Sequence, residues 1–214
     1  INILAEQIGQ GLPIVYLGHS SGGMRSVLAA SQNSNAIAVL GLDLVDALYP
    51  GMDNQYYALS AVSDMMIPVW GMFGESSACN ANSNGVNVFQ DAALGNAVII
   101  TEADHCDFEL PTNFFCSLLC EQENYIFSED DIERVVLNLS TSFILSIVNF
   151  SELNIQLWEP GNNYYDSLVT VGALQQITSL SVNEKMSDPV LFNLYQNFPN
   201  PFNSSTNIKY ELFK

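Results

Sequence analysis

Positive charge is scarce in this chain of 214 residues, which has five Lys and Arg against 23 Asp and Glu and a formal net charge of −18. Proteins that bind nucleic acids or anionic membrane surfaces need a basic patch, so the composition argues against both classes of partner. Long apolar runs are missing too, since none reaches the roughly 18 residues of a membrane-spanning helix. Hydrophobic residues nevertheless make up 48% of the chain, which excludes a wholly disordered protein.

The most informative motif is GHSSGG at residues 18–23, which fits the pattern G-x-S-x-G. The apolar run before it, 13–17, predicts a strand, and residues 24–30 after it predict a helix. A strand, this motif and a helix in that order form the nucleophile elbow of α/β-hydrolases, where a sharp turn exposes a serine hydroxyl. We therefore predict Ser20 as a nucleophile, and we expect a Cβ atom at position 18 or 22 to clash at the turn.

Histidine is nearly absent, so the general base that such a serine requires has only two candidates. His19 lies beside Ser20, where we expect its side chain to point away from the hydroxyl as a packing or surface residue. His105 lies in a polar loop after the apolar and β-branched run 96–101. The last triad member of an α/β-hydrolase occupies such a loop, in the chain order Ser, acid, His. His105 is therefore the predicted base.

Three carboxylates are candidates for the acid that orients this base, and their local sequence does not choose between them. Asp43 ends the predicted strand 36–42, and Asp46 lies three residues further on. Glu75 ends the predicted strand 67–74, at the position where most α/β-hydrolases keep their acid. Ligands bind at the carboxyl ends of the strands in such sheets, so an acid at the end of either strand is well placed.

Four motifs together resemble the chlorophyllase-like esterases and, more distantly, the secreted platelet-activating-factor acetylhydrolases. The motifs are GHSSGG at 18–23, GLDLVD at 41–46, IPV at 67–69 and DHCD at 104–107. Both families are α/β-hydrolases whose acid follows the strand after the elbow helix, which implies Asp43. The resemblance covers about residues 1–150. Ser21 stands where chlorophyllases carry Arg, which argues against chlorophyll as a substrate.

The N-terminal residues depart from this pattern. Residues 1–8 predict a short amphipathic helix that runs directly into the elbow strand. The backbone N–H of Ser21 supplies one donor of an oxyanion hole, but the strands and loop that carry the second donor are missing. We therefore expect the C-terminal half of an α/β-hydrolase over residues 1–178, a parallel sheet flanked by helices. The helix that begins at Ser128 is its predicted last helix.

The four cysteines are Cys79, Cys106, Cys116 and Cys120. An even number in an exported chain favours disulfides, for which three pairings are possible. Cys79 belongs to the polar loop 75–85, so a bridge from it would hold a substrate-facing loop. Zinc is the weaker alternative, because there is no C-x-x-C pair and the nearby histidine is already assigned to the nucleophile. We expect no metal and no other cofactor.

The composition changes toward the C-terminus. Residues 179–190 are polar and predict a linker. Residues 191–214 contain QNFPNPFN at 196–203, and residues 208–212 alternate apolar and polar side chains as a half-buried strand does. This segment resembles the start of the C-terminal sorting domain of type IX secretion substrates. The resemblance implies a β-sandwich truncated after its first strand, the secretion machinery as a partner, and a secreted or surface-attached protein.

The sequence therefore predicts a secreted serine ester hydrolase that acts on a small-molecule or polymeric carboxylic ester. In this hypothesis Ser20, His105 and Asp43 form the triad and the reaction passes through an acyl-enzyme. The alternative hypothesis is a binding or surface protein that keeps the α/β-hydrolase fold without its activity.

Overall fold

Two units make up the structure, a computed structural model, and they divide between Thr178 and Ser179. The predicted helix over residues 1–8 and the predicted linker 179–190 lie outside the described residues. The described residues are 11–48, 56–109, 111–112, 114–120, 126–149, 156–177, 192–194, 198–203, 205–207 and 210–212.

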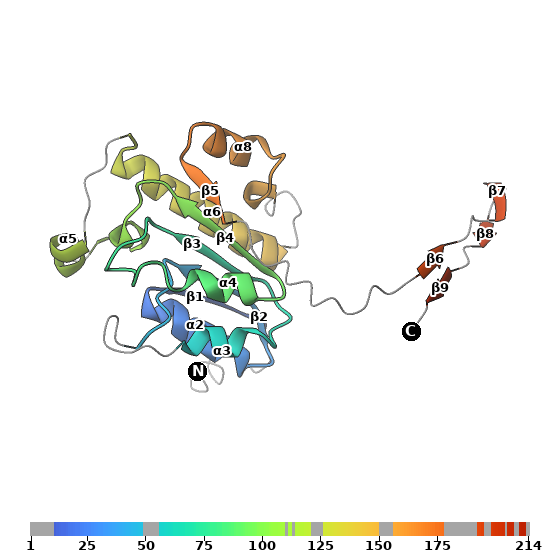
Figure 1. Ribbon diagram of the computed structural model, residues 1–214, viewed down its shortest axis with the longest axis horizontal. Coiled ribbons are helices and arrows are strands. Elements are labelled where there is room, and N and C mark those ends of the chain that lie inside the picture. The colour runs from blue at the N-terminus through green and yellow to red at the C-terminus, as the bar shows by residue number, and fades with distance from the viewer. Residues whose placement is uncertain are drawn as a thin grey trace. The chain divides into compact units, whose positions relative to one another are not determined.

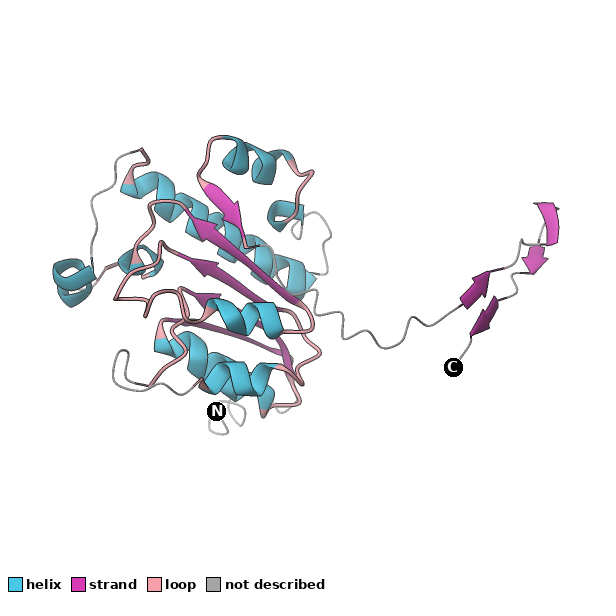
Figure 2. Cartoon of the chain, in the orientation of Figure 1, coloured by secondary structure: helices cyan, strands magenta, loops and turns pink. Residues whose placement is uncertain are grey.

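A five-stranded sheet forms the centre of the first unit (Figures 1 and 2). The strands, in their order across the sheet, are β1 (Ile14–His19), β2 (Ala36–Leu42), β3 (Val69–Phe73), β4 (Gly95–Ile100) and β5 (Leu174–Gln176). β1 to β4 pair in parallel, whereas β5 pairs antiparallel with β4. The unit is thus an α/β fold with a mixed, mostly parallel sheet, which corrects the expectation of a purely parallel one.

Helices cover both faces of this sheet. One face carries α2 (Ser21–Ser31), α3 (Tyr57–Val62) and α4 (Val86–Asp91), and the other carries α6 (Glu129–Asn149) and α8 (Asn163–Thr170) (Figure 1). Alternate residues of β2 enter the two cores: Leu40 belongs to the α6 side and Val39 to the α2 side. A strand that is buried on both faces needs a continuous apolar run, as β2 has.

The helix α6 is not the last one of this unit, contrary to the prediction. Its first turn is acidic, which complements the helix dipole, and the backbone N–H of Asp131 donates to Ser128 Oγ at 3.3 Å. The 3-10 helix η2 (Gln156–Trp158), α8 and β5 follow it. The chain turns from α8 into β5 at Gly172, whose φ is 78°. β5 has only three residues, too few for an alternating pattern to reveal a strand.

Two short elements follow β4 on the way to α6: the 3-10 helix η1 (His105–Phe108) and the helix α5 (Phe114–Cys120). η1 begins with the predicted base, so the position of this short helix decides where the His105 ring lies. Among the described residues no helix is both long enough and apolar enough to cross a bilayer.

The described residues of the second unit form four short strands, where the sequence predicted only one. They are β6 (Phe192–Leu194), β7 (Phe198–Asn203), β8 (Ser205–Asn207) and β9 (Tyr210–Leu212). β6 pairs antiparallel with β9, and β7 pairs antiparallel with β8. The β7–β8 register is irregular between Phe198 and Asn203, the stretch that contains both prolines, and proline cannot donate to a ladder.

Candidate active site

Ser20 occupies the turn between β1 and α2. Its backbone has φ 55° and ψ −133°, a conformation that a residue with a Cβ atom rarely adopts. The Ser20 N–H donates to the carbonyl oxygen of Leu42 at 3.0 Å, and the Ser20 carbonyl oxygen accepts from the N–H groups of Gly23 at 2.9 Å and Val45 at 3.1 Å. These three bonds hold the serine in a strained conformation, which is a feature of functional sites.

Of Gly18 and Gly22, the two positions where the sequence predicted a clash, only Gly18 lies too close to another part of the backbone to carry a Cβ atom. A Cβ atom on Gly18 would collide with the backbone of Gly22 and would lie 2.6 Å from Ser26 Oγ. A Cβ atom on Gly22 would meet no described heavy atom within 4 Å, so the expected clash at position 22 is wrong. The two Cβ atoms would point in different directions. A Cβ on Gly18 would point from the strand into the backbone of α2, whereas a Cβ on Gly22 would point away from the strand. The second close contact is at Gly23, where a Cβ would lie 3.0 Å from the Gly18 carbonyl oxygen.

Asp43 and His105 meet in the interior of the protein. Asp43 Oδ2 lies 2.6 Å from His105 Nδ1; Asp43 is fully buried and His105 is 7% exposed. A carboxylate only accepts hydrogen bonds, so Nδ1 carries a hydrogen, and in a neutral ring with this tautomer Nε2 has the lone pair. Neither of the other two candidate acids bonds to this ring.

Asp46 instead caps a helix. It is fully buried, and its carboxylate accepts from the backbone N–H groups of Tyr57 at 2.9 Å, Ala58 at 2.7 Å and Leu59 at 3.0 Å, at the start of α3. The unpaired N–H groups of a helix N-terminus are stabilised by such a carboxylate. Both carboxylate oxygens of Asp46 are therefore hydrogen-bonded to the backbone of α3.

Glu75 lies at the surface, where its Oε1 accepts from the backbone N–H of Glu102 at 3.1 Å. Glu102 has a positive φ of 61°, and its own carboxylate accepts from the N–H groups of Ile126 and Phe127 at 2.8 and 2.9 Å. Glu75 thus belongs to a chain of contacts that supports the turn after β4.

The second oxygen of Asp43 is held by a residue that the sequence did not single out. Asp43 Oδ1 accepts from the backbone N–H of Gly74 and from Nδ2 of Asn80, both at 3.2 Å. Asn80 lies in the loop between β3 and α4, and it is fully buried. That loop contains three asparagines within five residues, and nothing in their spacing shows which one turns inward.

His19 packs on the His105 ring. The ring centroids are 4.4 Å apart with an angle of 40° between the planes, and His19 Nε2 lies 2.9 Å from the His105 carbonyl oxygen. The carbonyl can only accept, so His19 Nε2 carries a hydrogen. Burial, and then the nearby His105, lower the pKa of His19 below its usual value and favour the neutral ring. The sequence predicted a packing or surface residue but not that His105 is its partner.

Among the hydrogen bonds of the described residues, none joins the Ser20 hydroxyl to the His105 ring. The two residues nevertheless belong to adjoining segments, because His19 precedes Ser20 in the chain and contacts both the ring and the backbone of His105. Catalytic hydrogen bonds are often long or poorly aligned before a substrate binds.

Two further carboxylates flank His105 in the chain: Asp104 caps the N-terminus of η1 and Asp107 lies within it. Asp104 Oδ1 accepts from the Cys106 N–H at 2.7 Å, and Asp107 Oδ2 accepts from the Asp104 N–H at 2.7 Å. Asp107 is 8% exposed, and this burial raises its pKa to about 7, with a smaller contribution from the negative charge of Asp104. The protonation of Asp107 is thus linked to the segment that carries the candidate base.

The four cysteines form two disulfides, as the even number of cysteines predicted. Cys79 pairs with Cys120 and Cys106 pairs with Cys116, with Cα–Cα distances of 5.8 and 5.7 Å. The Sγ atoms of Cys106, Cys116 and Cys120 lie within 4.8 Å of one another. Because all of these sulfurs are in disulfides, none is the thiolate that a metal ion requires.

Both disulfides lead to the helix α5. Cys116 and Cys120 are four residues apart, so they lie on one face of the helix. Their partners directly neighbour Asn80 and His105 in the chain. One short helix therefore fastens the loop that holds Asp43 and the segment that holds His105.

Arg25 lies close to the start of α2, one turn after Ser21. Its Nη1 donates to Ser21 Oγ at 3.0 Å. The N-terminal end of a helix carries a partial positive charge and backbone N–H groups without helical partners, so the position of Ser21 suits an anionic oxygen.

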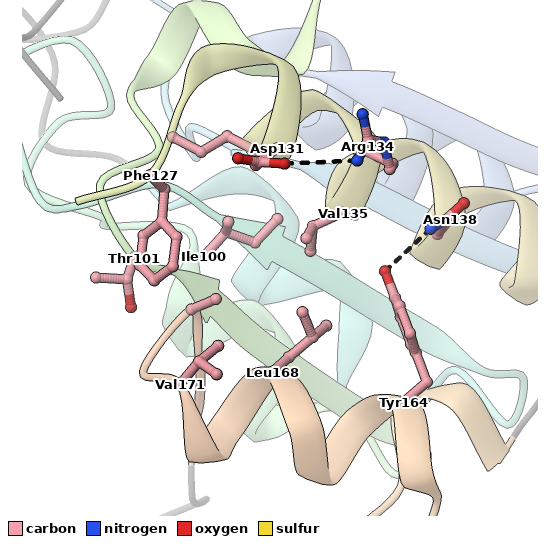
Figure 3. A pocket seen from close by; sticks show the side chains of 12 residues that line it. Ile100, Thr101, Phe127, Asp131, Arg134, Val135, Asn138, Tyr164, Leu168 and Val171 are labelled. Atoms are coloured by element: carbon pink, nitrogen blue, oxygen red, sulfur yellow. Dashed lines mark hydrogen bonds and ion pairs between the residues drawn. The ribbon is translucent and has the colours of Figure 1, made fainter. Parts of the chain in front are cut away.

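A separate apolar cavity of about 390 Å³ lies between α6 and α8 (Figure 3). Ile100, Phe127, Val135, Leu168 and Val171 are among its apolar lining residues. Figure 3 also shows two polar contacts there, Asp131 to Arg134 at 3.5 Å and Asn138 Nδ2 to the Tyr164 hydroxyl at 3.1 Å. Ser20, Asp43 and His105 do not line this cavity. Its polar lining residues do not include a nucleophile hydrogen-bonded to a base.

The chain matches no protein-family model and no curated protein. Among solved structures it is similar to the crystal structure of the esterase domain of a protein from Rhodothermus marinus, with a TM-score of 0.44 and 18% sequence identity. The similarity covers 65% of this chain and 63% of that chain, so the chain spans less than two thirds of that domain's length. A similarity of this degree does not assign an activity.

Proposed function

We propose that the first unit is a serine ester hydrolase with Ser20, His105 and Asp43 as its catalytic triad. The observation that carries this proposal is the 2.6 Å contact between the buried Asp43 carboxylate and His105 Nδ1. The strained backbone of Ser20, in the turn between β1 and α2, supports it further. A strained serine and a histidine whose ring is oriented by a buried acid are the groups that nucleophilic catalysis of this kind uses.

In the proposed mechanism, the Ser20 hydroxyl attacks the ester carbonyl carbon and gives its proton to His105 Nε2. Asp43 holds the ring through Nδ1 and stabilises the imidazolium that forms. The backbone N–H of Ser21 donates to the developing oxyanion. His105 then protonates the leaving alcohol, and the acyl-enzyme forms. Water, activated by the same histidine, hydrolyses the acyl-enzyme and restores Ser20.

The substrate class in this proposal is a carboxylic ester, either a small molecule or a polymer. The four short motifs that resemble chlorophyllase-like esterases support membership of that group. The two disulfides support an oxidising compartment outside the cytoplasm. We further propose that residues 191–214 belong to a type IX sorting domain, residues 179–190 being the linker, so that the protein is secreted or attached to the cell surface.

A fluorophosphonate probe tests the proposal directly, because it labels only a serine that its surroundings activate. We expect the wild-type chain to be labelled and Ser20→Ala to lose the labelling without loss of its circular dichroism spectrum. Ser31→Ala is the matched control, since Ser31 is an exposed serine of the same helix whose hydroxyl donates to a backbone carbonyl. Labelling that survives in Ser20→Ala contradicts the proposal, and a folded wild type without labelling favours the inactive binding protein.

Hydrolysis of a p-nitrophenyl ester separates the candidate acids. Asp43→Asn should lower kcat by up to about 10⁴-fold, the loss known when the triad acid of a serine protease is replaced in this way. Glu75→Gln should have little effect, because the Glu75 carboxylate bonds to the backbone of Glu102. Equal losses in the two variants would contradict the role of Asp43.

A further inference from the structure

Asn80 has an unusually complete set of hydrogen bonds for an amide that is shielded from water. Its Oδ1 accepts from the backbone N–H groups of Ser77 at 2.9 Å and Ser83 at 3.0 Å. Its Nδ2 donates to the Glu75 carbonyl oxygen at 2.8 Å and to Asp43 Oδ1 at 3.2 Å. An amide group offers two donors and two acceptor sites, so all four are used.

These contacts fix which end of the amide faces Asp43. Two backbone N–H groups point at one end, and only the carbonyl oxygen can accept from them. The NH₂ group must therefore face the two acceptors, Asp43 Oδ1 and the Glu75 carbonyl oxygen. A flipped amide would lose all four bonds, and buried polar groups without partners are costly.

The Asp43 carboxylate depends on this donor for its orientation. Oδ2 faces His105 Nδ1, and among the described residues the donors to Oδ1 are Asn80 Nδ2 and the Gly74 N–H. A carboxylate with donors on both oxygens is restricted in rotation, so Oδ2 stays directed at His105 Nδ1. The two donors to Oδ1 therefore stabilise the bond between Asp43 Oδ2 and His105 Nδ1, which orients the candidate base.

We propose that Asn80 is the positioning residue of the Asp43–His105 pair: it acts through the Asp43 carboxylate and does not touch the substrate. The inference rests on the proposed function, since the pair matters for catalysis only if His105 is the base. It adds a residue that the triad itself does not include. The Cys79–Cys120 disulfide, next to Asn80 in the chain, fastens the loop that presents this amide.

The variant that tests this proposal is Asn80→Asp, which keeps the shape of the side chain. One carboxylate oxygen can still accept from Ser77 and Ser83, but the other then faces Asp43 Oδ1 and the Glu75 carbonyl oxygen, and the ionised side chain offers them no donor. A proton shared between the two carboxyl groups would restore a donor, so kcat is measured up to alkaline pH, where that proton is lost. Like charges at this distance repel, so the Asp43 carboxylate should turn away from its present orientation.

The matched control is Asn84→Asp in the same loop. Asn84 also bonds to a backbone through both ends of its amide, accepting from the Asp46 N–H at 3.0 Å and donating to the Asp46 carbonyl oxygen at 3.3 Å. It forms no hydrogen bond with Asp43 in the described part of the chain. Both variants change the net charge equally, but Asn80 is fully buried and Asn84 only half-buried. The NMR signal of the His105 Nδ1 hydrogen therefore separates the contact with Asp43 from the cost of burying a charge.

We expect Asn80→Asp to lower kcat by about 10- to 100-fold, the range found when the partner behind a metal-bound histidine is removed. KM should stay within about twofold, because Asn80 is not part of the binding surface. In proton NMR spectra the His105 Nδ1 hydrogen, moved far downfield by its short bond to a carboxylate, should shift or broaden. Asn84→Asp should change neither kcat nor this resonance.

An Asn80→Asp variant with wild-type kcat and an unmoved His105 resonance would overturn the proposal, as would equal effects of the two variants. If Asn80→Asp does not fold, the side-chain amide resonances of Asn80 decide the question in Asp43→Asn. They must move there while those of Asn84 do not, and unmoved Asn80 resonances would refute the contact. A wild-type chain without esterase activity would contradict the proposed function, while the NMR result still decides whether Asn80 positions the pair.

Discussion

Asp107 makes the stability of the protein depend on pH in a way that one substitution can isolate. Its pKa is raised from 3.8 to about 7, mainly by burial and further by the negative charges of Asp104, Glu129 and Glu133. The folded state therefore holds this proton more tightly than the unfolded state does. The stability that Asp107 contributes is complete below about pH 4, falls as the pH rises, and is lost above about pH 7.

The magnitude follows from the pKa difference. At about 1.4 kcal/mol per pH unit, a pKa raised from 3.8 to about 7 corresponds to a loss of about 4 kcal/mol across the whole range. About 3 kcal/mol of this loss falls between pH 5 and pH 8. Asp107→Asn removes the titration and keeps an oxygen that can accept from the Asp104 N–H, as Oδ2 does at 2.7 Å.

Urea denaturation at pH 5 and pH 8 provides the assay. The free energy of unfolding of Asp107→Asn, relative to wild type, should increase by about 3 kcal/mol from pH 5 to pH 8. Asp130→Asn, which removes an exposed carboxylate from the first turn of α6, controls for the change in net charge. A difference between variant and wild type that stays constant with pH, or that falls, would refute the reasoning about the burial of Asp107.

Two further predictions concern stability alone. Cys120→Ser should lower the free energy of unfolding by about 4 kcal/mol and Cys116→Ser by about 3 kcal/mol, because the disulfides that they remove close loops of 41 and 10 residues. Calorimetry of each variant against wild type measures this, and a larger loss for the shorter loop would contradict it. Gly18→Ala should lower the free energy of unfolding by at least about 1 kcal/mol because its Cβ meets helix backbone, whereas Gly22→Ala, with open space around its Cβ, should be tolerated; equal denaturation midpoints would show that the strand and helix can separate.

Several helices and strands of the first unit could be predicted because a pattern of adjacent residues indicates each of them. The apolar run of β2, the glycine pattern at the turn and the acidic first turn of α6 are local signals, and the structure has these elements at the expected places. The sheet's fifth strand could not be predicted, because its three residues pair with β4 only after the chain has reversed. In the second unit β6, β8 and β9 are equally short, with three residues each.

The surroundings of His105 could be predicted only in part, because side chains from separate loops meet there. A carboxylate at the end of β2 can be expected near this edge of the sheet, but the sequence does not show that Asp46 is used by α3. It also does not show that Asn80 turns inward, or that His19 lies on the His105 ring. Each of these contacts joins residues at least eleven positions apart, and no periodic pattern encodes them.

The contacts of Asp43 explain why the ends of β2 and β3 have different roles, although each carries an acidic residue. β3 ends beside Asp43, and there its backbone supplies a donor, the Gly74 N–H, to Asp43 Oδ1. The next residue of that segment, Glu75, offers its carbonyl oxygen to Asn80, which is the second donor to the same carboxylate oxygen. The end of β3 thus orients the acid that β2 provides. In Asp43→Asn, Glu75 should therefore not replace the lost acid, because its carboxylate accepts from the Glu102 N–H, whereas the Gly74 N–H and Asn80 Nδ2 point at position 43. Hydrolysis of a p-nitrophenyl ester checks this: Asp43→Asn and the double variant with Glu75→Gln should have the same residual kcat, and a further loss in the double variant would contradict the argument.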